Sequence, residues 1–525
     1  MLFPSWGFAL LIAVLLPVYY LVPKRWQRYV LLLANVCFYA FAGLFALLLL
    51  LFTALSAYLF TRAIGRAWDE QRRTLALHRT DWDKPQRKAY RERMENRRKR
   101  LTALCLTLHF GILFWMKYGA GMIGLFNGVF HTAWSGTRLL LTMGVSFYTF
   151  STMGYVIDVQ RGAYPAERDP LNVLLFTSFF PILVQGPISR FDRLGSTLFS
   201  THEFSWENLE AGLLRALWGY WKKLLVADRL LVAVKQLLRY PDTYNGAFVL
   251  LGMLLYAATL YADFTGGIDI TIGVGRMLGI SIEENFERPY FSKSIAEYWR
   301  RWHMTLGAWF REYLYYPISV SAPMRRLVKA ARALGDGVSR RLPVYLATLA
   351  VWAVTGMWHG NSWNFLVWGL CNGVILLLSE ELSPLYARFH TRFPKLGQTW
   401  GYRAFAVVRT VLLLSTLRLF DCYATVGETM RAFGSMVSVW NLPLLWRGGV
   451  QSLGLNGGDW AAALLGVGAM LCVSLRQRRG RLTPAFLRRP LGFRLTVYGA
   501  LLFTILVFGY YGFGFEVGQF IYNRF

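Results

Sequence analysis

The sequence predicts an all-α, polytopic integral membrane protein. Apolar residues make up 55% of the 525-residue chain and charged residues only 16%, whereas soluble domains carry about 25% charged residues. The apolar residues also occur in long blocks without an alternating or helical period, and a helix that spans a bilayer needs about 20 of them. A third observation is the net charge of +28, carried by basic residues that lie between the apolar blocks.

The apolar blocks predict about 11–13 membrane segments, some of which we expect to be re-entrant or interfacial. The first block, residues 8–22, lacks a basic leader and a small-residue cleavage site, so we expect it to remain as a span. The candidate segments begin near Phe8, Tyr29, Leu44, Leu101, Leu139, Leu171, Ala247, Ile295, Leu342, Trp363, Arg403, Trp460 and Leu495.

Basic residues gather in the polar stretches between these blocks. The largest stretch runs from Thr61 to Arg100 and is predicted to be a loop, with residues 325–341 and 476–494 similarly basic. Lys and Arg accumulate in cytoplasmic loops and face anionic lipid there, so we expect all three stretches to be cytoplasmic. This placement accounts for the charge, so membrane lipid is the expected partner and nucleic acid is not.

Several common kinds of site have no sequence signature in this chain. The five cysteines are scattered and form no C-x-x-C pair, which argues against a disulfide framework or a zinc site. The sequence also lacks H-E-x-x-H, G-x-S-x-G and phosphate-binding-loop motifs. We therefore predict no metal and no cofactor.

The first polar cluster inside an apolar run lies at residues 260–269. Asp263 and Asp269 interrupt the run, and ionisable residues at membrane depth are costly enough to raise a functional hypothesis. The pair Gly266-Gly267 is predicted to break the helix. The alternative, which we favour, is that the two carboxylates cap helix ends or pair with arginines.

The second cluster lies at residues 296–311. Arg300, His303, Gly307 and Arg311 follow one another at helical spacing, which predicts a polar stripe on one amphipathic helix with room beside His303. An interfacial helix with an aromatic belt and snorkelling arginines explains the same pattern, so both interpretations stay open.

The third cluster, residues 355–362, separates two apolar stretches that are together too long for one span. We therefore expect the chain to break or turn here, with His359 bracketed by Gly356 and Gly360. Flanking glycines permit unusual backbone angles and close approach of other groups. A histidine in such a place is either a satisfied structural residue or a catalyst, and the residues alone do not decide between them.

Taken in order, these clusters resemble the membrane-bound O-acyltransferase family. The resemblance is to its bacterial branch, which O-acetylates alginate and D-alanylates teichoic acids, and it covers residues 1–380 best. The matching motifs are Gly144-Val145-Ser146-Phe147-Tyr148, Asp158-Val159-Gln160-Arg161-Gly162, Gly186-Pro187-Ile188-Ser189-Arg190-Phe191, Asp263-Phe264-Thr265-Gly266, Asn285-Phe286 with Pro289-Tyr290, Glu297-Tyr298-Trp299-Arg300-Arg301-Trp302-His303, and Trp358-His359-Gly360.

The resemblance implies a helical core with a tunnel through a thinned centre, assigned to residues 1–400, followed by C-terminal transmembrane helices in residues 401–525. It implies that His359 is the essential histidine and His303 the second histidine of the active site. The expected substrate-binding residues are Arg300, Arg311, Asp263, Asn285 and Trp358. Two features depart from the family pattern, namely the run Thr265-Gly266-Gly267-Ile268-Asp269 and the length of the polar stretch 61–100.

The chemistry expected from this resemblance is acyl transfer from a thioester to a hydroxyl in the bacterial plasma membrane. A neutral, buried imidazole is a competent base, so His359 is predicted to deprotonate the acceptor, and His303 to position or polarise the carbonyl or the acceptor. The length of the C-terminal part favours an acetyl group and a cell-surface polysaccharide. The expected donor is acyl-CoA or an acyl carrier protein, and an extracytoplasmic acyltransferase is a further candidate partner.

Three other functions remain open from the sequence. A D-alanyltransferase fed by a carrier protein would need the same core. A transporter or flippase would also have broken helices and buried charges, although no inverted repeat is visible. A non-catalytic scaffold for a partner acyltransferase is the third.

Overall fold

The computed structural model describes residues 3–134, 142–480 and 482–511. This part of the chain is helical and contains no strand, only one isolated antiparallel bridge between Phe286 and Trp302. The all-α prediction is confirmed. The segment predicted to begin near Leu139 starts outside the described residues.

The chain forms two compact units. The first comprises Met1–Gly212 with Thr271–Glu283, and the second comprises Leu213–Ile270 with Glu284–Phe525. The division between residues 400 and 401 concerns the catalytic core and stays a prediction.

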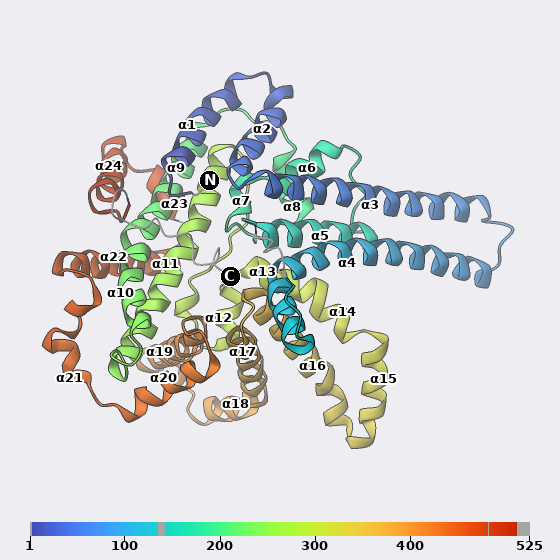
Figure 1. Cartoon of the computed structure of the whole chain (residues 1–525). Coiled ribbons are helices and arrows are strands. Elements are labelled where there is room, and N and C mark those ends of the chain that lie inside the picture. Colours follow the sequence, from blue (N-terminus) through green and yellow to red (C-terminus); the bar gives the residue numbers. More distant parts are fainter. Residues whose placement is uncertain (1–2, 135–141, 481, 512–525) are drawn as a thin grey trace. The chain divides into compact units, whose positions relative to one another are not determined.

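The first unit contains the N-terminal helices, which are drawn in blue to green in Figure 1. They are α1 (Trp6–Leu21), α2 (Gln27–Ala40), α3 (Leu44–Leu77), α4 (Lys84–Phe130), α5 (Val145–Arg161), α6 (Pro170–Ser178), α7 (Phe180–Leu183), α8 (Phe191–Leu198) and the start of α9 (Trp206–Trp221).

The second unit contains the remaining helices and both histidines predicted for the active site. They are α10 (Asp228–Arg239), α11 (Ala247–Met277, whose last turns belong to the first unit), α12 (Ile295–Arg301), α13 (Met304–Phe310), α14 (Tyr316–Ser319), α15 (Ala322–Ala331), α16 (Asp336–His359), α17 (Trp363–Glu381), α18 (Ser383–Arg392), α19 (Trp400–Leu417), α20 (Val426–Ser438), α21 (Leu442–Leu444), α22 (Gly457–Arg476), α23 (Leu482–Leu487) and α24 (Leu491–Phe508). Shorter turns used below are the π-helices η2 (Lys222–Ala227) and η4 (Arg311–Tyr315) and the 3-10 helix η7 (Arg418–Asp421).

Seven helices of the described part are long and apolar enough to cross a membrane, namely α3, α4, α11, α16, α17, α22 and α24. The prediction of a multi-pass membrane protein is therefore confirmed. The larger predicted number of segments included short helices, such as the one after Leu171, which is the nine-residue α6, and the one after Ile295, which is the seven-residue α12.

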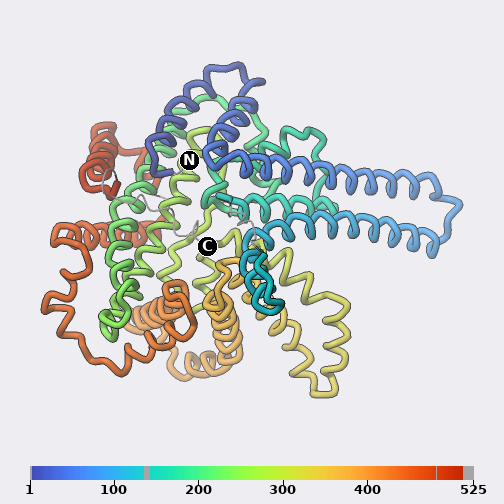
Figure 2. The backbone as a smooth tube through the Cα atoms, in the orientation of Figure 1, coloured from blue at the N-terminus to red at the C-terminus, as the bar shows by residue number. Residues whose placement is uncertain are grey.

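The stretch from Thr61 to Arg100 is helical, so the predicted loop is wrong. α3 continues through its polar half to Leu77, and α4 begins at Lys84; Figures 1 and 2 show the two helices side by side. Asp83 caps α4, because its carboxylate accepts a hydrogen bond from the backbone N–H of Gln86 at 2.7 Å, and the side-chain oxygen of Gln86 accepts one from the backbone N–H of Asp83 at 3.0 Å. We call residues 61–100 the arm.

Polar contacts between its two helices hold the arm together. Arg97 Nη1 lies 2.7 Å from Glu70 Oε2, and the guanidinium of Arg98 lies 3.6 Å from the ring of Trp68. At a rise of 1.5 Å per residue, the polar half of α3, residues 61–77, is about 25 Å long. The arm lacks the broad apolar stripe by which a surface helix is recognised, so hydropathy did not reveal it.

α11 is continuous through Gly266-Gly267, so the predicted break there is also wrong. A Cβ atom added at Gly219 of α9 would lie 2.5 Å from the carbonyl oxygen of Gly266, and one added at Gly266 would lie 2.9 Å from the carbonyl oxygen of Gly219. The glycines therefore permit close contact between α9 and α11, as small residues do between membrane helices generally.

Asp269, on α11, pairs with two cations from the segment that packs against it. Its carboxylate lies 2.5 Å from Arg215 Nε and 2.5 Å from Lys222 Nζ. Lys222 is the first residue of the π-helix η2, and both it and Asp269 are buried.

Asp263 has a comparable environment one and a half turns earlier. Lys223 Nζ lies 2.7 Å from Asp263 Oδ1 and 2.8 Å from Asp228 Oδ1, and all three side chains are buried. Both carboxylates of α11 are therefore ion-paired. Asp269 pairs with an arginine, as the favoured alternative held, and also with a lysine, whereas Asp263 pairs with a lysine instead of an arginine.

Candidate active site

His303 lies at a sharp turn between two short helices. α12 ends at Arg301, Trp302 is extended, and His303 adopts left-handed backbone angles (φ 47°, ψ 53°) before α13 begins. The turn is fixed from outside by Glu287 N–H, which donates to Arg301 O, and by Met304 N–H, which donates to Asn285 O, both at 3.0 Å.

This turn corrects the predicted helical stripe. The helix is interrupted at His303, so Arg300 and Arg311 do not share one helix face with this histidine. Arg300 belongs to α12, and Arg311 is the first residue of the π-helix η4. Gly307 is exposed, and an added Cβ atom there would meet nothing within 4 Å. The expected room for a ligand beside His303 stays a prediction.

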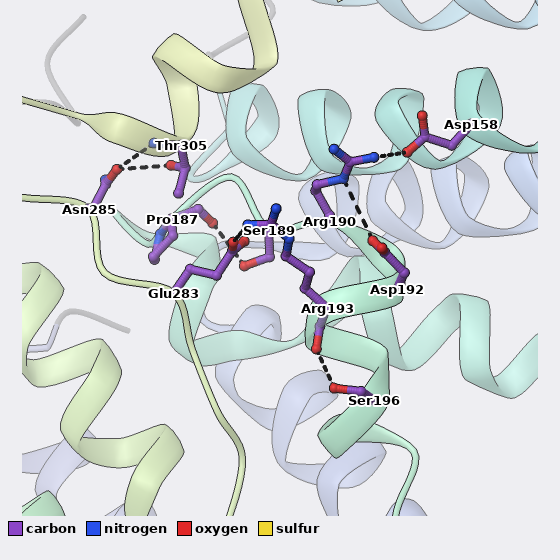
Figure 3. A network of polar contacts seen from close by, with 10 residues as sticks. All are labelled: Asp158, Pro187, Ser189, Arg190, Asp192, Arg193, Ser196, Glu283, Asn285 and Thr305. Atoms are coloured by element: carbon purple, nitrogen blue, oxygen red, sulfur yellow. Dashed lines mark hydrogen bonds and ion pairs between the residues drawn. The ribbon is translucent and has the colours of Figure 1, made fainter. Parts of the chain in front are cut away.

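Thr305 fixes the orientation of the Asn285 amide, and this amide in turn fixes the tautomer of His303. Its Oδ1 accepts hydrogen bonds from the backbone N–H of Thr305 at 3.1 Å and from the Thr305 hydroxyl at 2.9 Å, as Figure 3 shows. An N–H group can only donate, so the atom facing it must be the amide oxygen. His303 Nδ1, 3.2 Å from the same oxygen, must then carry a proton, which leaves the lone pair of the ring on Nε2.

Burial keeps the imidazole of His303 neutral. Desolvation, with a smaller contribution from the positive charge of Arg418, lowers the pKa of His303 to about 3. His303 lies outside the seven helices of spanning length. Its Nε2 is thus a hydrogen-bond acceptor throughout the physiological pH range.

His359 is the last residue of α16, and the chain turns after it into α17, which confirms the predicted break. A Cβ atom at Gly356 would lie 2.3 Å from the carbonyl oxygen of Phe365, and one at Gly360 would lie 2.0 Å from the Phe365 ring. Gly360 has extended backbone angles. The bracketing glycines therefore permit close contact between α16 and α17 rather than unusual dihedral angles.

Aromatic rings connect the two histidines. The ring of Trp358 lies 6.0 Å from that of His303 and 4.9 Å from that of His359, measured between centroids. Phe264 contacts His303 at 5.0 Å and Trp368 contacts His359 at 4.6 Å. Both histidines are buried. The structure thus brings together two histidines from distant parts of the sequence around one indole ring.

A family model for the membrane-bound O-acyltransferase family matches residues 167–328 and 332–417. A probable alginate O-acetylase of Azotobacter vinelandii is 31% identical over 382 residues, which cover 71% of this chain and 67% of that protein.

The chain belongs to the membrane-bound O-acyltransferase family.

Two further relatives of this O-acyltransferase differ in their acceptors. A peptidoglycan O-acetyltransferase of Helicobacter pylori is 28% identical over 72% of this chain and 68% of its own length. A teichoic acid D-alanyltransferase of Streptococcus thermophilus is 28% identical over 47% of this chain and 59% of its own length. His303 and Asn285 lie in the first segment matched by the family model, and His359 lies in the second.

Two of the sequence motifs meet in the first unit of the O-acyltransferase, as Figure 3 shows. Arg190 Nη2 lies 3.2 Å from Asp158 Oδ2, and Arg190 Nε lies 3.6 Å from Asp192 Oδ1. The Tyr164 hydroxyl donates to Asp158 Oδ2 at 3.2 Å. This ion pair explains the two motifs as parts of one structural contact between α5 and the segment before α8.

The other residues predicted to bind substrate lie in diverse environments. Asn285 and Trp358 contact or adjoin His303, whereas Asp263 pairs with Lys223. Arg300 and Arg311 are exposed. Their roles in binding stay predictions.

Arg418 and Trp368 are two residues near the histidines that the sequence motifs did not predict. Arg418 is 4% exposed, and its guanidinium lies 4.8 Å from the ring of Trp368. An arginine that interrupts the apolar run of residues 411–420 was a usable signal, because such residues at membrane depth mark functional or paired positions. Trp368 gave no signal, since it lies among other apolar residues.

Proposed function

We propose that this O-acyltransferase moves an acetyl group from a thioester donor on the cytoplasmic side to hydroxyls of a cell-surface polysaccharide. The observation that supports it most is the pair of buried histidines, His303 and His359, which both lie next to the ring of Trp358. The acetyl group and the acceptor class follow the activities for which the two O-acetylating relatives are named.

The two histidines are suited to different roles. A general base works best when its pKa lies near the operating pH, and the pKa of about 3 makes His303 a poor base. We assign the base to His359, the other buried histidine beside Trp358, which removes the proton from the acceptor hydroxyl. His303 holds that hydroxyl instead, because its Nε2 lone pair accepts a hydrogen bond but cannot donate one to a carbonyl oxygen.

Asn285 is suited to contact the reacting carbonyl. Its Oδ1 is occupied by Thr305 and His303, and no acceptor in the described part of the chain lies within hydrogen-bond reach of its buried Nδ2. A buried amide N–H without a partner is costly, so a substrate oxygen at this place would relieve that cost. A donor of this kind stabilises the negative charge that develops on the oxygen during acyl transfer.

The reaction then balances as follows. The acceptor oxygen forms a bond to the carbonyl carbon while His359 takes its proton. The C–S bond of the thioester breaks, and the thiolate leaves with the proton returned from His359. The donor is acyl-CoA or an acyl carrier protein, and both present the same thioester.

The test is mass spectrometry of ester-linked acids released from the envelope of cells that make the wild type, His359→Ala or His303→Asn. Asparagine suits residue 303 because it tolerates left-handed backbone angles. His390→Ala is the matched control, since His390 is an exposed histidine of α18. We expect wild type and control to raise ester-linked acetate, His359→Ala to abolish the increase, and His303→Asn to reduce it strongly at equal membrane abundance.

Two results would redirect the proposal. Release of D-alanine instead of acetate would assign the activity of the Streptococcus relative to this chain. Full acetate formation by His359→Ala would exclude His359 as the base.

A further inference from the structure

We propose that Arg418 is a positioning residue of the O-acyltransferase, which holds the segments carrying His303 and His359 in fixed relation to each other. The inference rests on the proposed roles of the two histidines. Arg418 lies one residue beyond the segment matched by the family model, which ends at residue 417.

Three indole rings surround the guanidinium of Arg418. Its Cζ atom lies 4.8 Å from the centroid of the Trp368 ring, 5.4 Å from that of Trp302 and 5.7 Å from that of Trp299. A guanidinium within about 6 Å of an indole face is attracted by the electrons of the ring, and the attraction is larger when water is excluded. We call these three rings the tryptophan cage.

Two walls of the cage adjoin the histidines. Trp302 is the extended residue directly before His303, and the Trp368 ring lies 4.6 Å from the ring of His359. Trp302 belongs to the turn after α12 and Trp368 to α17. Arg418 therefore contacts one residue from each histidine-bearing part.

The third ring of the cage, Trp299, connects Arg418 to α16, the helix that ends at His359. The Trp299 ring lies 4.7 Å from that of Trp352 and 5.9 Å from that of Trp368. A displacement of Arg418 would thus be felt by α12, α16 and α17 together, because closely packed interiors transmit strain.

An ion pair fixes the cation in the cage. Arg418 Nη1 lies 2.9 Å from Asp421 Oδ2, and the two side chains are only 5% and 2% exposed. A buried charge without its partner is strongly unfavourable, so this pair keeps Arg418 in place. The three rings and Asp421 hold the guanidinium in place, so the role inferred for Arg418 is that of a positioning residue.

The test compares Arg418→Lys and Asp421→Asn in the full chain, with Arg403→Lys as control. Lysine keeps the charge and can keep the ion pair, but it loses the flat face that stacks on the rings. Arg403 is an exposed arginine of α19. The first readout is the rate at which ester-linked acid accumulates in cells, normalised to membrane abundance. The second is amide hydrogen exchange of the purified protein at residues 301–307 and 358–362, with the arm as internal reference.

We expect Arg418→Lys to lower the rate on the order of 10-fold or more, since small misplacements of reacting groups are costly. Exchange should become faster in both histidine segments but not in the arm, and Asp421→Asn should act in the same direction. Unchanged exchange in both segments, or a wild-type rate for Arg418→Lys, would overturn the proposal. If the wild type itself forms no ester, the proposed function fails, and the exchange measurement still decides the role of Arg418.

Discussion

The arm and the contact that α9 and η2 together make with α11, called the α9–α11 contact here, both contain charged residues, but in different surroundings. The arm contains fourteen Lys and Arg against six Asp and Glu, and most of them are exposed. The contact between η2 and α11 contains Lys222 and Lys223 with their aspartates, all buried. Solvent stabilises most charges of the arm, with the buried Arg98 as an exception, whereas each buried charge of the contact depends on its partner.

This difference indicates which charged residues contribute most to the free energy of unfolding. An exposed ion pair contributes about 0–1 kcal/mol and is screened by salt. A buried pair is not necessarily better than an apolar pair of the same shape, but removal of one partner costs about 3–5 kcal/mol. Three substitutions test this comparison, from the largest expected effect to the smallest.

Lys223→Met is expected to have the largest effect. The change leaves Asp228 and Asp263 buried without their shared cation, so we expect a loss of about 3–5 kcal/mol. Thermal unfolding of the protein in detergent and its abundance in the membrane measure it. An unchanged unfolding midpoint would mean that water reaches these carboxylates and that the contact resembles the arm after all.

Asp228→Asn is expected to act in the opposite direction and to depend on pH. Burial is the main cause that raises the pKa of Asp228 to about 6, with Lys223 opposing it and Asp263 adding to it. The folded state therefore binds more protons than the unfolded state between about pH 4 and pH 6, and wild-type stability falls as the pH rises through this window.

Asparagine imitates the protonated carboxyl, so the variant should be more stable than the wild type above pH 6, by at most about 2–3 kcal/mol, and equal to it below pH 4. Thermal unfolding at several pH values measures the difference. A variant that is less stable than the wild type at pH 7.5 would show that the ionised Asp228 is needed by Lys223.

Arg97→Ala should have the smallest effect. Its pair with Glu70 has side chains that are 57% and 50% exposed, so we expect a loss below about 1 kcal/mol. The same unfolding measurement with and without 1 M salt checks it, since salt should remove even this difference. A large loss that persists in salt would mean that the arm depends on its charges as the α9–α11 contact does.

The long apolar blocks predicted the fold class because a spanning segment of about 20 consecutive apolar residues satisfies its backbone hydrogen bonds within itself as a helix, whatever its neighbours are. They did not predict the arm, since its helical character comes from caps and local ion pairs rather than from an apolar face. The sequence pattern also predicted a helix break at Gly266-Gly267, where α11 is continuous. Glycines break a helix or allow a second helix to approach, and the choice depends on Gly219, which is 47 residues away in the sequence.

The sequence indicated the parts of the candidate site that depend on side-chain type. It did not indicate the parts that depend on backbone conformation. His303 and His359 follow from polar residues in apolar surroundings. The turn at His303 does not, because it depends on backbone hydrogen bonds that Met304 donates to Asn285 and that Glu287 donates to Arg301, and a helical period does not link these residues. Arg418 was missed for a similar reason, since its significance comes from rings that are distant in sequence.

The left-handed backbone at His303 also limits how this position can change over generations. Among non-glycine residues, Asn, Asp and His tolerate such angles best, while β-branched residues are strongly disfavoured. A lineage that no longer needed the imidazole would still need a residue that fits the turn. Genetic drift at residue 303 should therefore lead to Asn, Asp or Gly more often than to Ala or Val, so inactive descendants should be recognisable by that replacement.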